Sequence, residues 1–330
     1  MSANVEKMAF TGSRDDIWHR EGTEMPEGMS FETWMTAAGL DWHAYRTPAF
    51  TKMPNGEFKA IDGWSYLTRS DTDNQIGYVS DASYKIAQPM DVGLSVKRYV
   101  DVDDRFRFNT AGSLDGGRRI WFNAQFNGDI EVGGSAHKAY LLASTSFDGT
   151  LATYMQATLT RVVCDNTLHA AVWGKDAKAS QIKIYHNAKF DAASAGKQLA
   201  EIVKSFDHFK QMGDAMATVE LVNGEVSSFF KKLLDIDPKD KWDDLSTRKQ
   251  NQFNAMRACY DETMQEGTEK GTVWTALNAV TRYVDHNRSS RNGDSPTSAR
   301  FDSALFGSGA NMKAQAVGLL MPLVKDKIAA

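Results

Sequence analysis

The chain has 330 residues, of which 42% are hydrophobic, 11% aromatic and 24% charged. These shares are typical of folded globular proteins, and they exclude a disordered, collagen-like or disulfide-scaffold chain. The chain contains 38 Lys and Arg residues and 42 Asp and Glu residues, so its formal net charge is −4. This charge excludes a surface that is basic all over. The length allows one large domain or two.

The sequence carries no signal for membrane insertion or secretion. Its longest apolar runs, such as residues 139–143, are far shorter than the roughly 18 to 20 residues of a membrane span. The first ten residues include Glu6 and Lys7 and lack a continuous apolar stretch. Cys164 and Cys259 stand outside any redox or metal motif, which predicts reduced, buried thiols. We therefore expect a cytoplasmic protein without membrane contact.

Three regions follow one another along the chain. Residues 1–56 are an N-terminal arm rich in Gly and Pro, with one short helix over 30–38 that Ser30 caps and Gly39 ends. Residues 57–190 form an α+β core with an antiparallel sheet. Its strands are expected from aromatic and β-branched runs bounded by turn residues, at 64–68, 76–80, 105–110, 120–126 and 138–146.

Two helices are expected inside this core. Residues 88–99 begin with Pro89 in the first turn, and their buried side is expected to hold Met90, Val92, Leu94, Val96 and Tyr99. A second helix is expected over 160–173. The predicted fold class is therefore α+β: a curved antiparallel sheet backed by a helix and followed by an all-helical C-terminal region.

Residues 191–330 form that helical region. The region contains apolar residues at the three- and four-residue spacing of an amphipathic helix: Leu199, Ile202, Phe206, Phe209 and Met216. Such a stripe serves either a helix that lies against the sheet or a helical seam between two chains. Pro238 marks a break, and further helices are expected at 246–264, 271–285 and 310–324.

Sequence motifs for known chemistry are mostly missing. Residues 112–119 resemble a phosphate-binding loop, but arginines replace its Lys and Ser or Thr, and a strand follows, so a hairpin turn explains the glycines better. The seven histidines have no zinc-ligand spacing, and we expect no metal and no cofactor. Asp101, Asp103 and Asp104 could hold a divalent cation, but a solvated turn after the helix is the commoner arrangement.

Basic and aromatic residues interleave along the middle region. Arginine and lysine neutralise phosphates while aromatic faces stack on unpaired bases, so this mixture favours binding of single-stranded nucleic acid. The simpler alternative is that alternate strand residues face solvent and core. The candidate binding residues are Lys85, Lys97, Arg98, Arg105, Arg107, Arg118, Arg119, Trp121, Lys138, Tyr140 and Arg161, with Phe106 and Phe122 among them.

Four stretches form a recognisable pattern: Val5–Phe10 with Trp18, His19 and Pro26–Gly28; Ala37–Trp42; Thr160–Leu168; and Gly271–His286. Through them the chain resembles the phage and plasmid-like protein family known as domain of unknown function 932. After His19, the chain departs from the family's usual run of glycine, leucine and glycine. The family has no assigned activity. Its members tend to be encoded by phages, prophages and plasmids, often among replication and recombination genes.

The order of strands and helices is also similar to that of single-strand annealing recombinases, which assemble into rings or filaments. Together with the basic and aromatic residues, the resemblances favour a single-stranded DNA-binding accessory protein of recombination or replication in a bacterial host cell. The unpaired edges of an open sheet predict head-to-tail contacts between chains, and so a homo-oligomer larger than a dimer, in a ring or a filament. One alternative is an enzyme of mobile-element metabolism or defence, with a site of Arg161, Asn166, Asp285 and His286. Another is a structural or interaction protein. Asn166 and His286 also suit helix capping.

Overall fold

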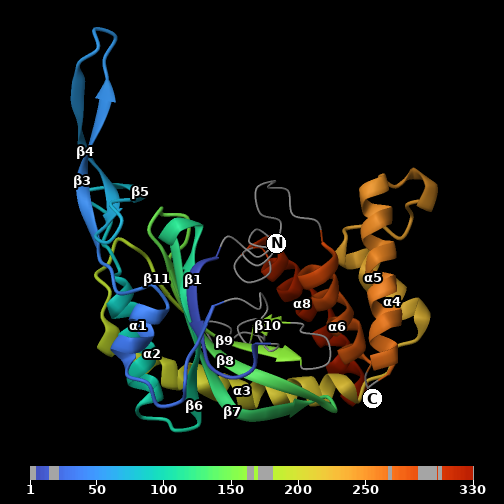
Figure 1. The fold of residues 1–330 in the computed structure, drawn as a ribbon. Coiled ribbons are helices and arrows are strands. Elements are labelled where there is room, and N and C mark those ends of the chain that lie inside the picture. The colour runs from blue at the N-terminus through green and yellow to red at the C-terminus, as the bar shows by residue number, and fades with distance from the viewer. Residues whose placement is uncertain are drawn as a thin grey trace. The chain divides into compact units, whose positions relative to one another are not determined.

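The computed structural model describes residues 5–14, 22–161, 167–169, 181–266, 270–288, 303 and 307–329 (Figure 1). The chain divides into two compact units. One contains residues 1–127, 140–156 and 181–203, and the other contains residues 128–139, 157–180 and 204–330. The expected α+β class is confirmed, because mostly antiparallel sheets precede a series of helices.

The strands form two sheets. The larger follows the order β10-β9-β8-β7-β6-β1-β2, with β11 also paired to β9, and the smaller has the order β3-β4-β5. The pairing of β1 with β2 is parallel, and that of β1 with β6 is antiparallel. The strands are β1 (Val5–Phe10), β2 (Thr23–Glu24), β3 (Ala44–Lys52), β4 (Phe58–Arg69), β5 (Gln75–Ser80), β6 (Phe106–Leu114), β7 (Arg119–Val132), β8 (Ser135–Ser146), β9 (Thr153–Arg161), β10 (Thr167–His169) and β11 (Gln181–Ile184).

The five strands expected in the core are confirmed in β4, β5, β6, β7 and β8, although β6 begins at Phe106, one residue later than expected. The arm holds strands that the sequence did not predict, since β1 buries Met8, Ala9 and Phe10 in the larger sheet. The helix expected over 160–173 is wrong at the residues that the structure describes there, 160–161 and 167–169. Strand β9 runs to Arg161, and β10 pairs with it antiparallel, with Thr167 opposite Thr160.

Two helices support the first unit. In α1 (Phe31–Ala37) the expected cap is confirmed, because Ser30 Oγ accepts a bond from Thr33 N–H at 3.2 Å. Helix α2 (Pro89–Val100) packs on β6. It lies so close to the sheet that a Cβ at Gly93 would come within 2.8 Å of the Phe122 ring on β7. The expected buried side is corrected at Met90, which is exposed, while Gly93 and Ser95 are buried.

Strands β3 and β4 of the smaller sheet run on past β5 as a two-stranded ribbon (Figure 1). Every residue from 50 to 60 is exposed, including Phe50 and Phe58. The base of this sheet is packed, because Leu67 and Val79 are buried and Gly77 lies against the Phe147 carbonyl.

The expected helical region is also confirmed. It consists of α3 (Ala192–Ala217), α4 (Asn223–Leu233), α5 (Thr247–Glu266), α6 (Val273–Arg282), a π-helical turn η6 (Tyr283–Asn287) and α8 (Ser308–Ala329). In the second unit α6 packs against α5 and α8, and all nine residues from Val273 to Thr281 are buried. None of the helices within the described ranges is long and apolar enough to cross a membrane.

Candidate nucleic-acid interface

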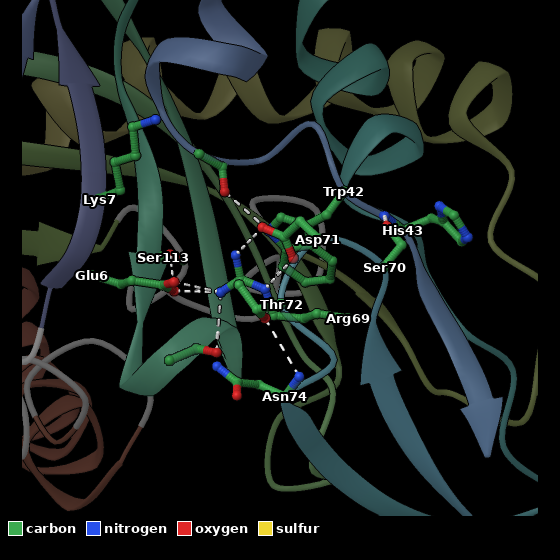
Figure 2. Close-up of polar contacts among 12 residues, drawn as sticks. Glu6, Lys7, Trp42, His43, Arg69, Ser70, Asp71, Thr72, Asn74 and Ser113 are labelled. Atoms are coloured by element: carbon green, nitrogen blue, oxygen red, sulfur yellow. Dashed lines mark hydrogen bonds and ion pairs between the residues drawn. The ribbon is translucent and has the colours of Figure 1, made fainter.

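A buried arginine organises one end of the larger sheet (Figure 2). The side chain of Arg69, at the end of β4, is 3% exposed. Its Nη1 donates to both Glu6 carboxylate oxygens at 2.7 and 2.5 Å and to the Gly116 carbonyl at 3.2 Å. Its Nε and Nη2 donate to Asp71 at 2.9 and 2.7 Å. The guanidinium also lies 4.7 Å from the centre of the Trp42 ring.

These contacts join four segments that are far apart in the sequence, and they fix the charge state of the site. Hydrogen bonding from Arg69 holds the pKa of the Asp71 carboxyl below its usual value, although burial acts in the opposite direction. Burial alone would lower the pKa of Arg69, but the bonds to Asp71 and Glu6 outweigh burial and raise it. Ser113 Oγ donates to Glu6 at 3.0 Å, which ties β6 into the same network.

The network supports the tight turn between β6 and β7. The hairpin expected over 112–119 is confirmed, because Leu114 pairs with Arg119 in an antiparallel ladder. Asp115, Gly116 and Gly117 all have positive φ, between 52° and 90°. A Cβ at Gly117 would lie 2.7 Å from Arg69 Nη1, so the turn needs glycine there to approach the buried cation. The turn presents the exposed side chain of Arg118.

Three predicted cationic residues meet at the β8–β9 turn, residues 147–152. The Arg118 carbonyl accepts from Phe147 N–H at 2.8 Å, and Arg119 Nη2 donates to Thr150 Oγ1 at 3.1 Å. Lys85 reaches the same turn through His186. We call Lys85, Arg118, Arg119 and His186 the turn cluster.

His186 holds Lys85 in place with its ring and its backbone. Its Nδ1 lies 3.1 Å from the Lys85 carbonyl and its Nε2 lies 3.0 Å from the Leu151 carbonyl. Its own carbonyl accepts from Lys85 N–H. The ring stacks on Tyr84 at 4.4 Å between centroids. The backbone beside Lys85 is therefore fixed against the β8–β9 turn, while the Lys85 side chain is exposed.

The turn cluster carries a small excess of positive charge. Lys85, Arg118 and Arg119 contribute three positive charges, and Asp115 and Asp148 in the adjoining turns contribute two negative ones, which leaves +1. Within the described part of the chain, Lys85 and Arg118 have no carboxylate at ion-pair distance. Both side chains are available to an anion without breaking an existing pair.

The other predicted basic residues of the first unit lie at the opposite end of β6. Arg107 is seven residues from Leu114, which is about 23 Å along the strand. Most of these residues are already paired. Arg105 binds Asp103 at 2.8 and 2.7 Å, Arg107 binds Glu27 at 3.4 Å, and Lys97 binds Asp101, while Arg98 is exposed. The structure thus divides the predicted set into two groups and does not join them in one patch.

The remaining candidates have different surroundings. Trp121 is 6% exposed and its Nε1 donates to Thr110 Oγ1 at 3.2 Å, so its ring packs in the sheet. Tyr140 and Lys138 are half-buried on β8. Arg161 ends β9, and Asn166 lies outside the described residues. In the second unit, His286 is exposed on η6.

Two residues that shape this candidate interface were not predicted from the sequence. Arg69 stands in a strand with Asp71 two positions later, but nothing in the sequence links it to Glu6 or Gly116. His186 has no partner at motif spacing, because its partners Lys85 and Leu151 are 101 and 35 residues away. Within the described ranges, no group of three or more His, Cys, Asp and Glu side chains is placed to hold a metal ion.

The fold and the turn cluster define an α+β protein with a cationic surface at one end of an antiparallel sheet. Residues 75–305 match the family described as Domain of unknown function (DUF932), and the chain belongs to that family. No curated protein and no solved structure matches the chain.

Proposed function

We propose that the protein binds single-stranded DNA through the turn cluster and serves recombination or replication of a phage or mobile element. The observation that carries the proposal is the exposure of Lys85 and Arg118, two cations without a carboxylate partner in the described residues. Arg118 is on the turn that Arg69 contacts, and the backbone of Lys85 is held by His186. Rigid placement lowers the entropy lost when the side chains contact phosphates. The family resemblance supplies the biological setting.

A single subunit offers few phosphate contacts. Three cations with a net local charge of +1 give weak binding by themselves, and the whole chain has a net charge of −4. Several subunits side by side would add their contacts on one strand, which raises the overall affinity without new contacts per subunit. We therefore propose a homo-oligomer larger than a dimer. Mass measurement in solution, with and without single-stranded DNA, tests it, and a strict monomer at micromolar concentration in both conditions contradicts it.

The binding proposal is tested with a fluorescently labelled oligonucleotide. The affinity of the wild-type protein should fall as salt rises, with little dependence on base sequence. The double variant Arg118→Glu plus Arg119→Glu should abolish binding and leave the oligomer intact. The matched control is Lys239→Glu plus Lys241→Glu, two exposed lysines of a loop in the second unit, which changes the net charge by the same amount.

The outcomes distinguish a specific effect of the turn cluster from an effect of the net charge. Loss of binding in both double variants attributes the effect to net charge and contradicts the assignment to the turn cluster. Retained binding in the Arg118 and Arg119 variant contradicts it as well. If the wild-type protein does not bind at low salt, single-stranded DNA is not its ligand.

A second candidate function is catalysis, and one observation in the second unit favours it. Lys313 on α8 has a fully buried side chain, and its Nζ donates to Asp285 Oδ1 at 2.5 Å. Asp285 belongs to the π-helical turn η6, and such turns are frequent at functional sites. A thermal-shift screen of metabolites against the wild-type protein and Lys313→Met tests this function. A compound that stabilises only the wild-type protein supports it, and no stabilisation by any compound counts against it.

A further inference from the structure

Strand β11 carries a cation between two aromatic rings. Lys183 Nζ lies 5.2 Å from the centre of the Tyr154 ring and 4.8 Å from that of Tyr185. Lys183 is exposed, and 59% of Tyr185 is exposed. A lysine at this distance from two rings is attracted by the negative potential of both faces, and it orients them.

These three residues lie on the same face of the sheet. Lys183 pairs directly with Tyr154 across the β9–β11 ladder, so their side chains share a face. Tyr185 is two residues after Lys183 and continues along that face. The neighbouring Met155 points the other way, since its sulfur is 3.8 Å from Ser95 Oγ on α2. The face that carries Lys183 is therefore the one opposite α2.

The cation and the tyrosines are continuous with the turn cluster along the chain. Tyr185 follows directly after β11 and precedes His186, whose ring binds the Lys85 and Leu151 carbonyls. A single strand of DNA whose phosphates contact Lys85 and Arg118 can thus reach Tyr185 within a short length of the DNA backbone. Hydrogen bonding to Tyr154 raises the pKa of Lys183 above its usual value, so the ammonium group is charged at neutral pH.

We infer that Tyr185, supported by Tyr154 and Lys183, is a stacking site for an unpaired base of single-stranded DNA, with Lys183 on the adjoining phosphate. This inference rests on the proposed function. An exposed ring accepts any base, because every base has a π-face, whereas duplex DNA hides that face in its own stack. The combination of an aromatic face and a cation suits a nucleotide, which presents a base and a phosphate together.

The experiment compares four variants with the wild-type protein, using a labelled oligothymidine at several salt concentrations. Tyr185→Ala should weaken binding about 5- to 150-fold at every salt concentration and leave the salt dependence unchanged, because a neutral ring is lost. Tyr185→Phe keeps the ring and should bind like the wild-type protein. Lys183→Met should lower the slope of log affinity against log salt by about 0.7, the effect of one phosphate contact.

The control is Tyr78→Ala on β5. Tyr78 is 41% exposed and stacks on Trp64 at 5.1 Å, so it offers a comparable aromatic surface without a cation over the ring among the described residues. Its replacement should leave DNA binding unchanged. Melting temperatures of all variants identify any loss that comes from unfolding.

Each result decides a different statement. Unchanged affinity of Tyr185→Ala, with binding by the wild-type protein, overturns the stacking site and leaves the proposed function intact. An equal loss in Tyr78→Ala overturns it too, because the effect is then not specific to β11. Absence of binding by the wild-type protein at low salt overturns both proposals. Equal affinity for single-stranded and duplex DNA also overturns the stacking site.

Discussion

Replacing Arg69 by methionine tests whether the buried cation holds the first unit together. Methionine keeps most of the volume of the side chain and removes its charge and all five donors. The carboxylates of Glu6 and Asp71 and the Gly116 carbonyl then lose the bonds that Arg69 donates, and Glu6 keeps only the bond from Ser113 among those described above. The contact with the Trp42 ring loses its cation as well. We expect a large loss of stability and a disturbed β6–β7 turn.

The size of the loss follows from the exposure of the partners. Removing one member of a buried ion pair costs about 3 to 5 kcal/mol when the other charge stays buried. The side chains of Glu6 and Asp71 are 32% and 39% exposed, so water can replace part of what Arg69 provides. That places the ionic loss near the lower limit, about 3 kcal/mol. The cation–π contact adds about 1 kcal/mol.

The loss should depend on pH. In the wild-type protein the pKa of Asp71 lies below its unfolded value, so its contribution is fully present above about pH 4 and is lost as pH falls through the folded pKa. The variant lacks this contribution. The difference in unfolding free energy between the two proteins should therefore be largest near neutral pH and should shrink toward pH 3.

Urea denaturation at 25 °C, followed by tryptophan fluorescence between pH 3 and pH 7, measures this difference. The control is Arg46→Met, since Arg46 pairs with Asp81 at 3.0 Å with side chains 29% and 40% exposed. Its cost should be about 1 kcal/mol. A difference for Arg69→Met that stays constant across the pH range, or that only equals the control, would refute the electrostatic account.

Two further predictions concern single residues. Gly117→Ala should cost about 2 to 3 kcal/mol by thermal or urea unfolding, because φ is +90° and the new Cβ would meet Arg69, whereas Gly116→Ala, with open space around it, should cost about 1 kcal/mol. Equal costs would mean that the contact with Arg69 does not matter. Burial raises the pKa of the Cys259 thiol to about 11, so a thiol reagent at pH 8 should modify it only in denaturant. Rapid modification of Cys259 in the native protein would contradict its burial.

The parts of the fold that local patterns determine could be predicted from the sequence. Ser30 and Gly39 bracket α1 as expected, and the aromatic and β-branched residues of β7 and the first turn at Pro89 place a strand and a helix correctly. The helix expected over 160–173 failed at its described residues, because pairing of β9 with β10 decides the conformation of 160–161 and 167–169, and pairing between strands leaves no short-range signal.

The candidate site was less predictable than the fold. Residue type alone put Arg107 and Arg118 in one basic set, although they lie at opposite ends of β6 and only Arg107 has a carboxylate partner in the described residues. Trp121 has the aromatic ring of a stacking residue, but this ring is buried like that of a core residue. Tyr185 and Lys183 became candidates only when the ladder placed Tyr154 beside them.

The burial of α6 gives a physical meaning to the longest stretch in the family resemblance. Gly271–His286 covers this helix and its π-helical end, and Trp274 within it is fully buried against Phe209 and the backbone at Gly133. A helix enclosed on every side tolerates few substitutions, because each change of volume leaves a cavity or a clash. Gly271–His286, the longest stretch in the family resemblance, is therefore explained by the packing of the second unit. The proposed DNA contacts, Lys85 and Arg118, lie outside this stretch on exposed positions of the first unit.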